Sequence, residues 1–245
     1  MSLLFLDLNM VTQNLYTLKV NNYSHLVNRL IAVNPKLYKS TVYIYKLQVY
    51  MRDITNNEML FVLNILKSLY TEYNANSISK TLGISSMGAL KIAKKLEKEN
   101  IIRLKVQGKA NFFILNLDDD YVKQYVKFLL KREYESANPY VKRWLNEIKS
   151  KIKSADSAIL FGSVLRKYED ARDIDVLFIT DQKRFSKLKK EIEDINFVNV
   201  KKIHPMFQNK EDIINNIKKN DKPLLSALRG IVIFGEDNLL ELLKR

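Results

Sequence analysis

A polar segment framed by two short apolar runs constrains the fold of this chain most strongly. The run Ser157–Phe161 is typical of a buried strand, and it stops at Gly162 and Ser163. After nine intervening residues, Asp173 and Asp175 flank a single isoleucine and lead straight into a second apolar run. Residues two apart on a strand face the same way, so both carboxylates are predicted on one face, about 6–7 Å apart. Because like charges this close repel each other, we expect a divalent cation between them.

The composition restricts the ligands that this cation can have. The chain has no cysteine and only two histidines, His25 and His204, which excludes disulfides, thiolate sites and a histidine-rich zinc site. Oxygen ligands remain, and these favour magnesium, manganese or calcium. The absence of cysteine also agrees with a reducing, cytoplasmic compartment. No apolar stretch approaches the ~20 residues of a membrane-spanning helix, and the first ten residues, which include Asp7, do not resemble a secretory signal.

The positive charge of the chain is concentrated before its last third. Of the formal net charge of +14, residues 56–117 carry +5 and residues 154–245 only +2. An excess of this kind attracts a polyanion regardless of its sequence. It is also what a lysine-rich proteome produces without any such partner, because Lys and Asn are abundant throughout.

The chain is long enough for two small domains with separate cores. Residues 1–55 form an extension to which we assign no function, although Ser40–Val49 is strand-like. After it, helical periodicity and capping residues predict helices at Asn57–Tyr70, Ser77–Leu82 and Met87–Asn100, followed by two strands between Ile101 and Leu115.

The joints between these elements are marked by turn and cap residues. Gly83 ends the second helix, and the hydroxyls of Ser85 and Ser86 are acceptors for the free amides at the start of the third. Gln107–Lys109 is a plausible hairpin turn between the strands.

Three helices and a hairpin in this order resemble the winged helix-turn-helix family over residues 56–117. The phrases Ala75–Ser85 and Leu96–Ile102 carry the resemblance. In such modules the helix after the turn enters the major groove and the wing touches the DNA backbone. The resemblance implies DNA contacts from Ser86, Lys91, Lys94, Lys95, Lys98, Lys105 and Lys109. Alternatively, these lysines keep an exposed helix soluble, or the module is a dimer platform.

Residues 118–153 are predicted to be a linker of two helices. Asp118–Asp120 suit a helix start because carboxylates there complement the amide dipoles, and Tyr121–Tyr134 follows. Pro139 begins a second helix that runs to about Lys153, with Trp144 on its apolar face as a core residue.

The segment described first resembles the DNA polymerase β-like nucleotidyltransferase superfamily, particularly its minimal prokaryotic members, over residues 154–245. The resemblance implies that Gly162, Ser163 and Arg166 hold nucleotide phosphates, as the start of a helix can. It further implies that Asp173 and Asp175 hold Mg²⁺, or Mn²⁺, against the triphosphate. An acceptor hydroxyl would then attack the α-phosphate of a nucleoside triphosphate (NTP) and release pyrophosphate.

The sequence departs from the superfamily pattern in three places. The interval from Gly-Ser to the first aspartate is one residue shorter than usual, and Arg172 replaces the customary serine. The third carboxylate is missing from the strand expected at Phe197–Ile203, where Asn199 takes the expected position. An amide can bind a metal but cannot act as a carboxylate base. His204 is interpreted as a strand-end residue without a catalytic role.

These patterns predict an α/β (α+β) chain: a winged helix, a helical linker and a small mixed-sheet nucleotidyltransferase fold. The first hypothesis is an Mg²⁺-dependent nucleotidyltransferase directed by a DNA-binding module. The second is a DNA-binding transcriptional regulator whose C-terminal fold has lost catalysis and senses nucleotides or binds a protein partner. A third is an antitoxin-like module that modifies or caps a toxin, and a homodimer is compatible with each.

Overall fold

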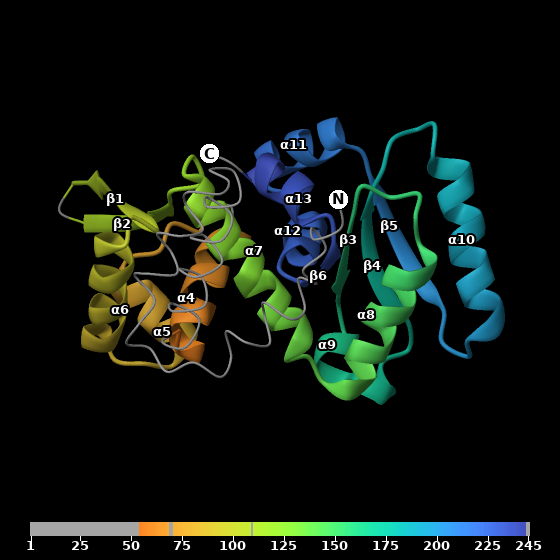
Figure 1. Cartoon of the computed structure of the whole chain (residues 1–245), viewed down its shortest axis with the longest axis horizontal. Helices are drawn as coiled ribbons and strands as arrows, with labels where there is room; N and C mark the ends of the chain where they lie inside the picture. The colour runs from red at the N-terminus through yellow and green to blue at the C-terminus, as the bar shows by residue number, and fades with distance from the viewer. Residues whose placement is uncertain (1–53, 69–70, 109, 244–245) are drawn as a thin grey trace, which may run out of the picture. The chain divides into compact units, whose positions relative to one another are not determined.

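The computed structural model of this protein describes residues 54–68, 71–108 and 110–243, which lie in one compact unit. Nearly all of the extension 1–55, with its strand-like stretch Ser40–Val49, therefore lies outside the described residues, as does Lys109. Element labels follow Figure 1.

A winged helix occupies the first part of the described chain (Figure 1). Its elements are the helices α4 (Asn56–Lys67), α5 (Ala75–Leu82) and α6 (Ser86–Lys98) and the antiparallel strands β1 (Ile102–Gln107) and β2 (Ala110–Leu115). Side chains at N-cap positions begin the helices: Thr55 with Glu58 forms a capping box on α4, and Ser85 accepts the amide of Gly88 on α6. The prediction of three helices and a hairpin is confirmed. The first and last residue of each element lie within three residues of the predicted ones.

The turn between α5 and α6 depends on Gly83. Its φ of 66° lies in the left-handed region that favours glycine. Its amide donates a hydrogen bond to the carbonyl of Lys80 at 3.4 Å. This sharp turn sets the direction in which α6 leaves the core.

The predicted linker helices are present as α7 (Asp120–Glu135) and α8 (Pro139–Lys151). Asp119 caps α7 by accepting the amide of Tyr121 at 2.9 Å. Trp144 on α8 is 1% exposed, in agreement with its prediction as a core residue.

The C-terminal part is a mixed four-stranded sheet with helices on both faces (Figure 1). Its strands are β3 (Ser157–Phe161), β4 (Ile174–Ile179), β5 (Ile203–Gln208) and β6 (Ile231–Phe234), in the order β5-β4-β3-β6. Only the β4–β5 pair is parallel. The helical segments are α9 (Val164–Lys167), the 3₁₀ turn η1 (Tyr168–Asp170), α10 (Phe185–Val198), α11 (Lys210–Lys218), α12 (Lys222–Leu228) and α13 (Glu236–Leu243).

The prediction of a strand at Phe197–Ile203 is wrong. Helix α10 continues to Val198, because Leu188, Ile192 and Ile195 recur at helical spacing and are buried on one face. The strand β5 therefore begins only at Ile203, several residues later than the prediction.

Asn199 accordingly lies away from the expected third ligand position. It is buried just past the end of α10, and its side-chain amide donates to the carbonyl of Ile195 at 2.9 Å and to Glu147 at 2.8 Å. Its amide oxygen accepts from Arg143. These bonds attach the end of α10 to α8, a structural role in place of the predicted one.

One hydrophobic core joins the winged helix to the sheet. Buried residues of α4, α6 and α7 belong to the same cluster as Ile159 of β3 and Leu177 of β4, and α12 and α13 complete it. The opposite face of the sheet packs in a second cluster, with Leu160 and Phe178 among residues of α8 and α10. The alternation of strand residues divides the sheet between the two clusters. The winged helix therefore shares its core with the sheet, where the chain length also allowed two separate cores.

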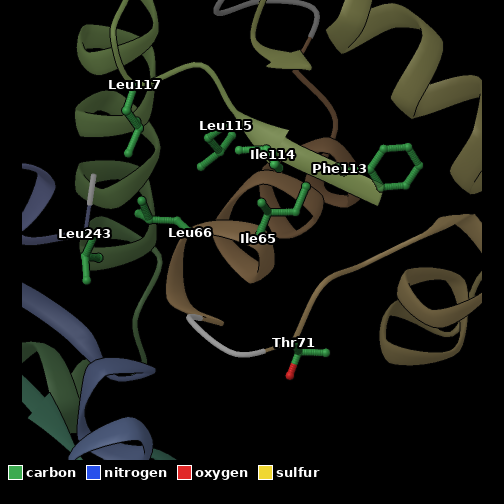
Figure 2. A pocket seen from close by; sticks show the side chains of 8 residues that line it. All are labelled: Ile65, Leu66, Thr71, Phe113, Ile114, Leu115, Leu117 and Leu243. Atoms are coloured by element: carbon green, nitrogen blue, oxygen red, sulfur yellow. The ribbon is translucent and has the colours of Figure 1, made fainter. Parts of the chain in front are cut away.

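A small cavity of about 30 Å³ lies in the shared core. Figure 2 shows its lining side chains, which come from α4, β2, α13 and the segments beside them: Ile65, Leu66, Thr71, Phe113, Ile114, Leu115, Leu117 and Leu243. A space of this size holds no more than about one water molecule, and Thr71 is the one polar side chain among those that line it. It is too small to take a ligand.

A buried ion pair also connects the winged helix to the sheet. The ammonium of Lys67, at the end of α4, lies 2.6 Å from both carboxylate oxygens of Glu133 on α7 and 2.7 Å from the carbonyl of Gly230. Burial lowers the pKa of the Lys67 ammonium, although Glu133 acts in the opposite direction. Gly230 in turn packs on the backbone of β3, where a Cβ would lie 2.2 Å from the carbonyl oxygen of Leu160.

We expect Lys67→Met to destabilise the protein by about 3 kcal/mol, because it leaves Glu133 and the Gly230 carbonyl without their partner. The measurement is urea unfolding followed by circular dichroism. The double variant Lys67→Met/Glu133→Leu removes both charges and should be more stable than the single variant. Equal stability of the single variant and the wild type would show that this ion pair contributes nothing to the connection.

Candidate functional site

The two aspartates of the sequence motif lie together at the start of β4. Asp175 is the second residue of the strand, Asp173 precedes it, and the fully buried Ile174 between them faces the core. Both aspartates are partly exposed, so their carboxylates are open to solvent at the end of the sheet where β4 begins. This is the arrangement that the two-residue spacing predicted.

A third group, which the sequence interpretation set aside, completes the cluster. Strands β4 and β5 are parallel with Asp175 opposite His204, so both side chains leave the same face of the sheet. The imidazole Nδ1 of His204 is 3.1 Å from Oδ1 of Asp175. One ligand atom each from Asp173, Asp175 and His204 lie within 4.8 Å of one another. Within the described residues this is the one group of three or more acidic or histidine side chains spaced to hold a metal ion.

The interpretation of His204 as a strand-end residue agrees with its place at the start of β5, but its approach to Asp175 was not predicted because the expected bounds of this strand were displaced. The expected strand began too early because the end of α10 and the residues just after it are apolar: Phe197 and Val198 in the helix and Val200 beyond it, all exposed. The informative signal was the helical spacing of the buried residues of α10, which carries the helix to Val198. A strand that begins at Ile203 places the next residue, His204, on the solvent face.

The predicted phosphate-binding turn touches this cluster directly. The last residue of β3, Phe161, pairs with Asp175, and the chain leaves the sheet at Gly162 with a φ of 82°. A Cβ at Gly162 would lie 2.0 Å from Oδ2 of Asp175, so the turn and the carboxylate are in van der Waals contact. Only glycine fits this position, for its backbone conformation and for its size.

Ser163 and Arg166 follow this turn on the short helix α9. The hydroxyl of Ser163 makes no capping bond to the helix, and Arg166 is exposed. Helix α9 has only four residues, so its dipole is a minor source of anion binding. The backbone turn, the hydroxyl and the guanidinium are the groups that the sequence resemblance assigns to a phosphate.

Gly162→Ala should lower the affinity of the cluster for Mn²⁺ by at least ~10-fold, because a Cβ there displaces the Asp175 carboxylate. The positive φ adds about 1–2 kcal/mol of destabilisation. Gly83→Ala is a matched control, since Gly83 has a similar φ but no atom within 4 Å of the place that a Cβ would take. Isothermal titration should show unchanged Mn²⁺ binding in the control; equal binding in both variants would contradict the close contact.

The exposed face of α6 presents the predicted DNA-contacting residues unequally. Ala89, Ala93 and Leu96 are buried against the core, which leaves Lys91, Lys94 and Lys98 exposed on the outer face with Ser86 at the start of the helix. Met87, at 74% exposure, and Leu90 lie beside them. This face is basic and open, as a helix that enters the major groove requires.

Of the predicted lysines that the structure describes, two form ion pairs with side chains of the same chain. The ammonium of Lys95 is 2.8 Å from the buried carboxylate of Glu58 on α4, and that of Lys105 is 2.6 Å from Glu72. Lys95 therefore points back to the core and stabilises the packing of α6 on α4. We separate it from Lys91 and Lys94 as a structural residue.

Comparisons with known proteins leave the family of this chain open. No protein-family model matches it, and no curated protein does. Among solved structures it is similar to the adhesin competence repressor AdcR from Streptococcus pyogenes, at 18% identity over 49% of this chain and 83% of that one, with a TM-score of 0.29. It is also similar to MepR, a transcription regulator of the Staphylococcus aureus multidrug efflux pump MepA, at 15% identity over 54% and 96% of the two chains, with a TM-score of 0.31.

Likenesses this distant carry no functional argument. The winged-helix assignment depends on the order and pairing of the elements from α4 to β2. None of the described helices is both long and apolar enough to cross a membrane.

Proposed function

We propose that this chain is a cytoplasmic, DNA-binding nucleotidyltransferase. In this proposal residues 56–117 bind DNA, and residues 154–245 transfer a nucleotide from an NTP to an acceptor hydroxyl. Residues 118–153 connect these two parts of the chain. The observation that carries it is the convergence of Asp173, Asp175 and His204 within 4.8 Å, in contact with the Gly162 turn.

The donor set fits a divalent cation such as Mg²⁺ or Mn²⁺. Two carboxylates supply negative charge and hard oxygen ligands, and all three side chains are at least partly exposed. When bound, the ion supplies Lewis-acid chemistry: it neutralises phosphate charge and activates the acceptor hydroxyl. The protein holds the two carboxylates at the start of β4 so that their mutual repulsion favours a cation.

The groups around the turn suit a triphosphate. Ser163 has a hydroxyl that is not used in capping, and Arg166 provides a permanent positive charge two residues beyond Val164. The small Gly162 lets the Asp175 carboxylate lie directly against the backbone of this turn. We assign Gly162, Ser163 and Arg166 to the nucleotide on these grounds.

DNA binding is supported by the exposed basic face of α6 and by the +5 charge of residues 56–117. The shared core gives this module a direct structural connection to the sheet. A DNA-bound winged helix would thus hold the transferase next to the DNA site to which the winged helix binds.

Transfer is tested with each of the four NTPs labelled at the α-phosphate, in Mg²⁺ and in Mn²⁺. The protein is incubated alone, with its genomic DNA, and with any co-purifying protein, and label in each macromolecule is measured. Label in one of these acceptors, or in the protein itself, supports the proposal. No transfer under any condition, with NTP binding retained, would reject it.

A second function rests on one observation: the third member of the cluster with Asp173 and Asp175 is His204 and not a carboxylate. A site altered in this way can retain nucleotide binding without catalysis, which makes the chain a DNA-binding regulator that senses an NTP. Its signature is a change in DNA affinity when NTP and metal are added, with the nucleotide recovered intact.

A further inference from the structure

The third member of the cluster is an imidazole, which lies within hydrogen-bond distance of Asp175. His204 stands opposite Asp175 in the parallel β4–β5 pair, and its side chain is 74% exposed on the same face as both acids. Its Nδ1 is 3.1 Å from Oδ1 of Asp175. This residue therefore occupies the place on the neighbouring strand from which a third ligand reaches the cation.

The separation of the two ligand atoms matches a shared ion. Ligands in neighbouring positions of an octahedron, each at about 2.1–2.2 Å from the metal, lie roughly 3 Å apart. Nδ1 of His204 and Oδ1 of Asp175 are 3.1 Å apart, and the ligand atom of Asp173 is within 4.8 Å of both. Rotation of these side chains, with the strands in place, is enough to bring all three ligand atoms to one cation.

The ligand types decide which cation is preferred. Mg²⁺ strongly favours oxygen ligands, whereas imidazole nitrogen suits first-row transition metals. Replacing a carboxylate by a neutral imidazole also removes one negative charge from the site, which weakens the electrostatic attraction on which Mg²⁺ depends most. Nitrogen coordination offsets this loss for a transition metal but much less for Mg²⁺.

We propose that His204 is a direct metal ligand and that the site selects Mn²⁺ or a related transition-metal ion over Mg²⁺. This inference rests on the metal part of the proposed function, and it deepens that function by naming the cation. The apparent loss of the third acid is then a change of metal preference.

The proposal is tested with tag-free protein loaded with one equivalent of Mn²⁺. Electron spin-echo envelope modulation should detect ¹⁴N coupling from one imidazole, and His204→Asp should abolish it. The chain has one other histidine, His25, so His25→Gln is the matched control and should retain the coupling.

Competition titrations provide the second measurement. The ratio of Mn²⁺ to Mg²⁺ affinity should fall about 10-fold in His204→Asp, because that variant has three carboxylates and no nitrogen ligand. Mn²⁺ binding that lacks ¹⁴N coupling, or an unchanged affinity ratio in His204→Asp, overturns the inference.

The two levels of the proposal fail in different ways. If Asp173→Ala/Asp175→Ala binds Mn²⁺ as tightly as the wild type, the acids hold no metal and the proposed function itself is wrong. If that variant loses Mn²⁺ while the wild type shows no nitrogen coupling, only the assignment of His204 is wrong. Neither measurement requires nucleotide transfer.

Discussion

Asp173→Ala/Asp175→Ala should abolish stoichiometric Mn²⁺ binding and lower nucleotide transfer at least ~1000-fold, equivalent to about 4 kcal/mol of the activation barrier. Both carboxylates converge with His204 within 4.8 Å, so the double variant leaves one neutral ligand. An imidazole alone, on a largely exposed side chain, cannot retain the ion. Isothermal titration and the α-labelled transfer assay measure the two effects.

The fold should survive this change, because the two carboxylates are partly exposed and Ile174 between them keeps its place in the core. Asp170→Ala/Asp194→Ala is the matched control: it removes the same charge from exposed positions on η1 and α10. The control should bind Mn²⁺ normally. Parallel losses in both variants would point to net charge, and transfer that persists without Asp173 and Asp175 would reject the site.

Lys91→Ala/Lys94→Ala should lower affinity for duplex DNA by about 10- to 100-fold at 0.1 M salt and reduce the slope of log K against log salt by about 2. Both ammonium groups lie on the exposed face of α6, where each can neutralise a phosphate. Fluorescence anisotropy at several salt concentrations measures both quantities. Lys187→Ala/Lys190→Ala removes the same charge from exposed positions on α10 and should leave the slope unchanged.

Lys95 lies on the same helix as Lys91 and Lys94, but we expect it to stabilise the fold and not to contact DNA. Lys95→Ala removes the cation that pairs with the buried carboxylate of Glu58 and should destabilise the fold by about 2 kcal/mol, although the capping bond from the Thr55 amide remains. Its effect on the salt slope should be small. A salt slope that changes with Lys95 and not with Lys91 and Lys94 would mean that a different face of α6 approaches DNA.

Local signals in the sequence predicted most of the helices and strands, because each of these elements depends on residues that are close together in the chain. Helices α4 and α6, the wing hairpin and the strand β3 follow from apolar periodicity and from turn or cap residues such as Gly83 and Ser85. The proximity of Asp173 and Asp175 follows from the geometry of a single strand. Such features require no knowledge of distant contacts.

Patterns among neighbouring residues were thus enough to specify the winged helix, the linker helices and the paired acids. That His204 joins these acids was settled by packing, because the register of β4 against β5 depends on where α10 ends and how it lies on the sheet. Packing likewise settled that Lys95 faces Glu58, that Asn199 bonds to α8, and that one core spans the winged helix and the sheet. Each of these contacts joins residues from separate elements. They lie close together only in the assembled fold, so no pattern among neighbouring residues predicts them.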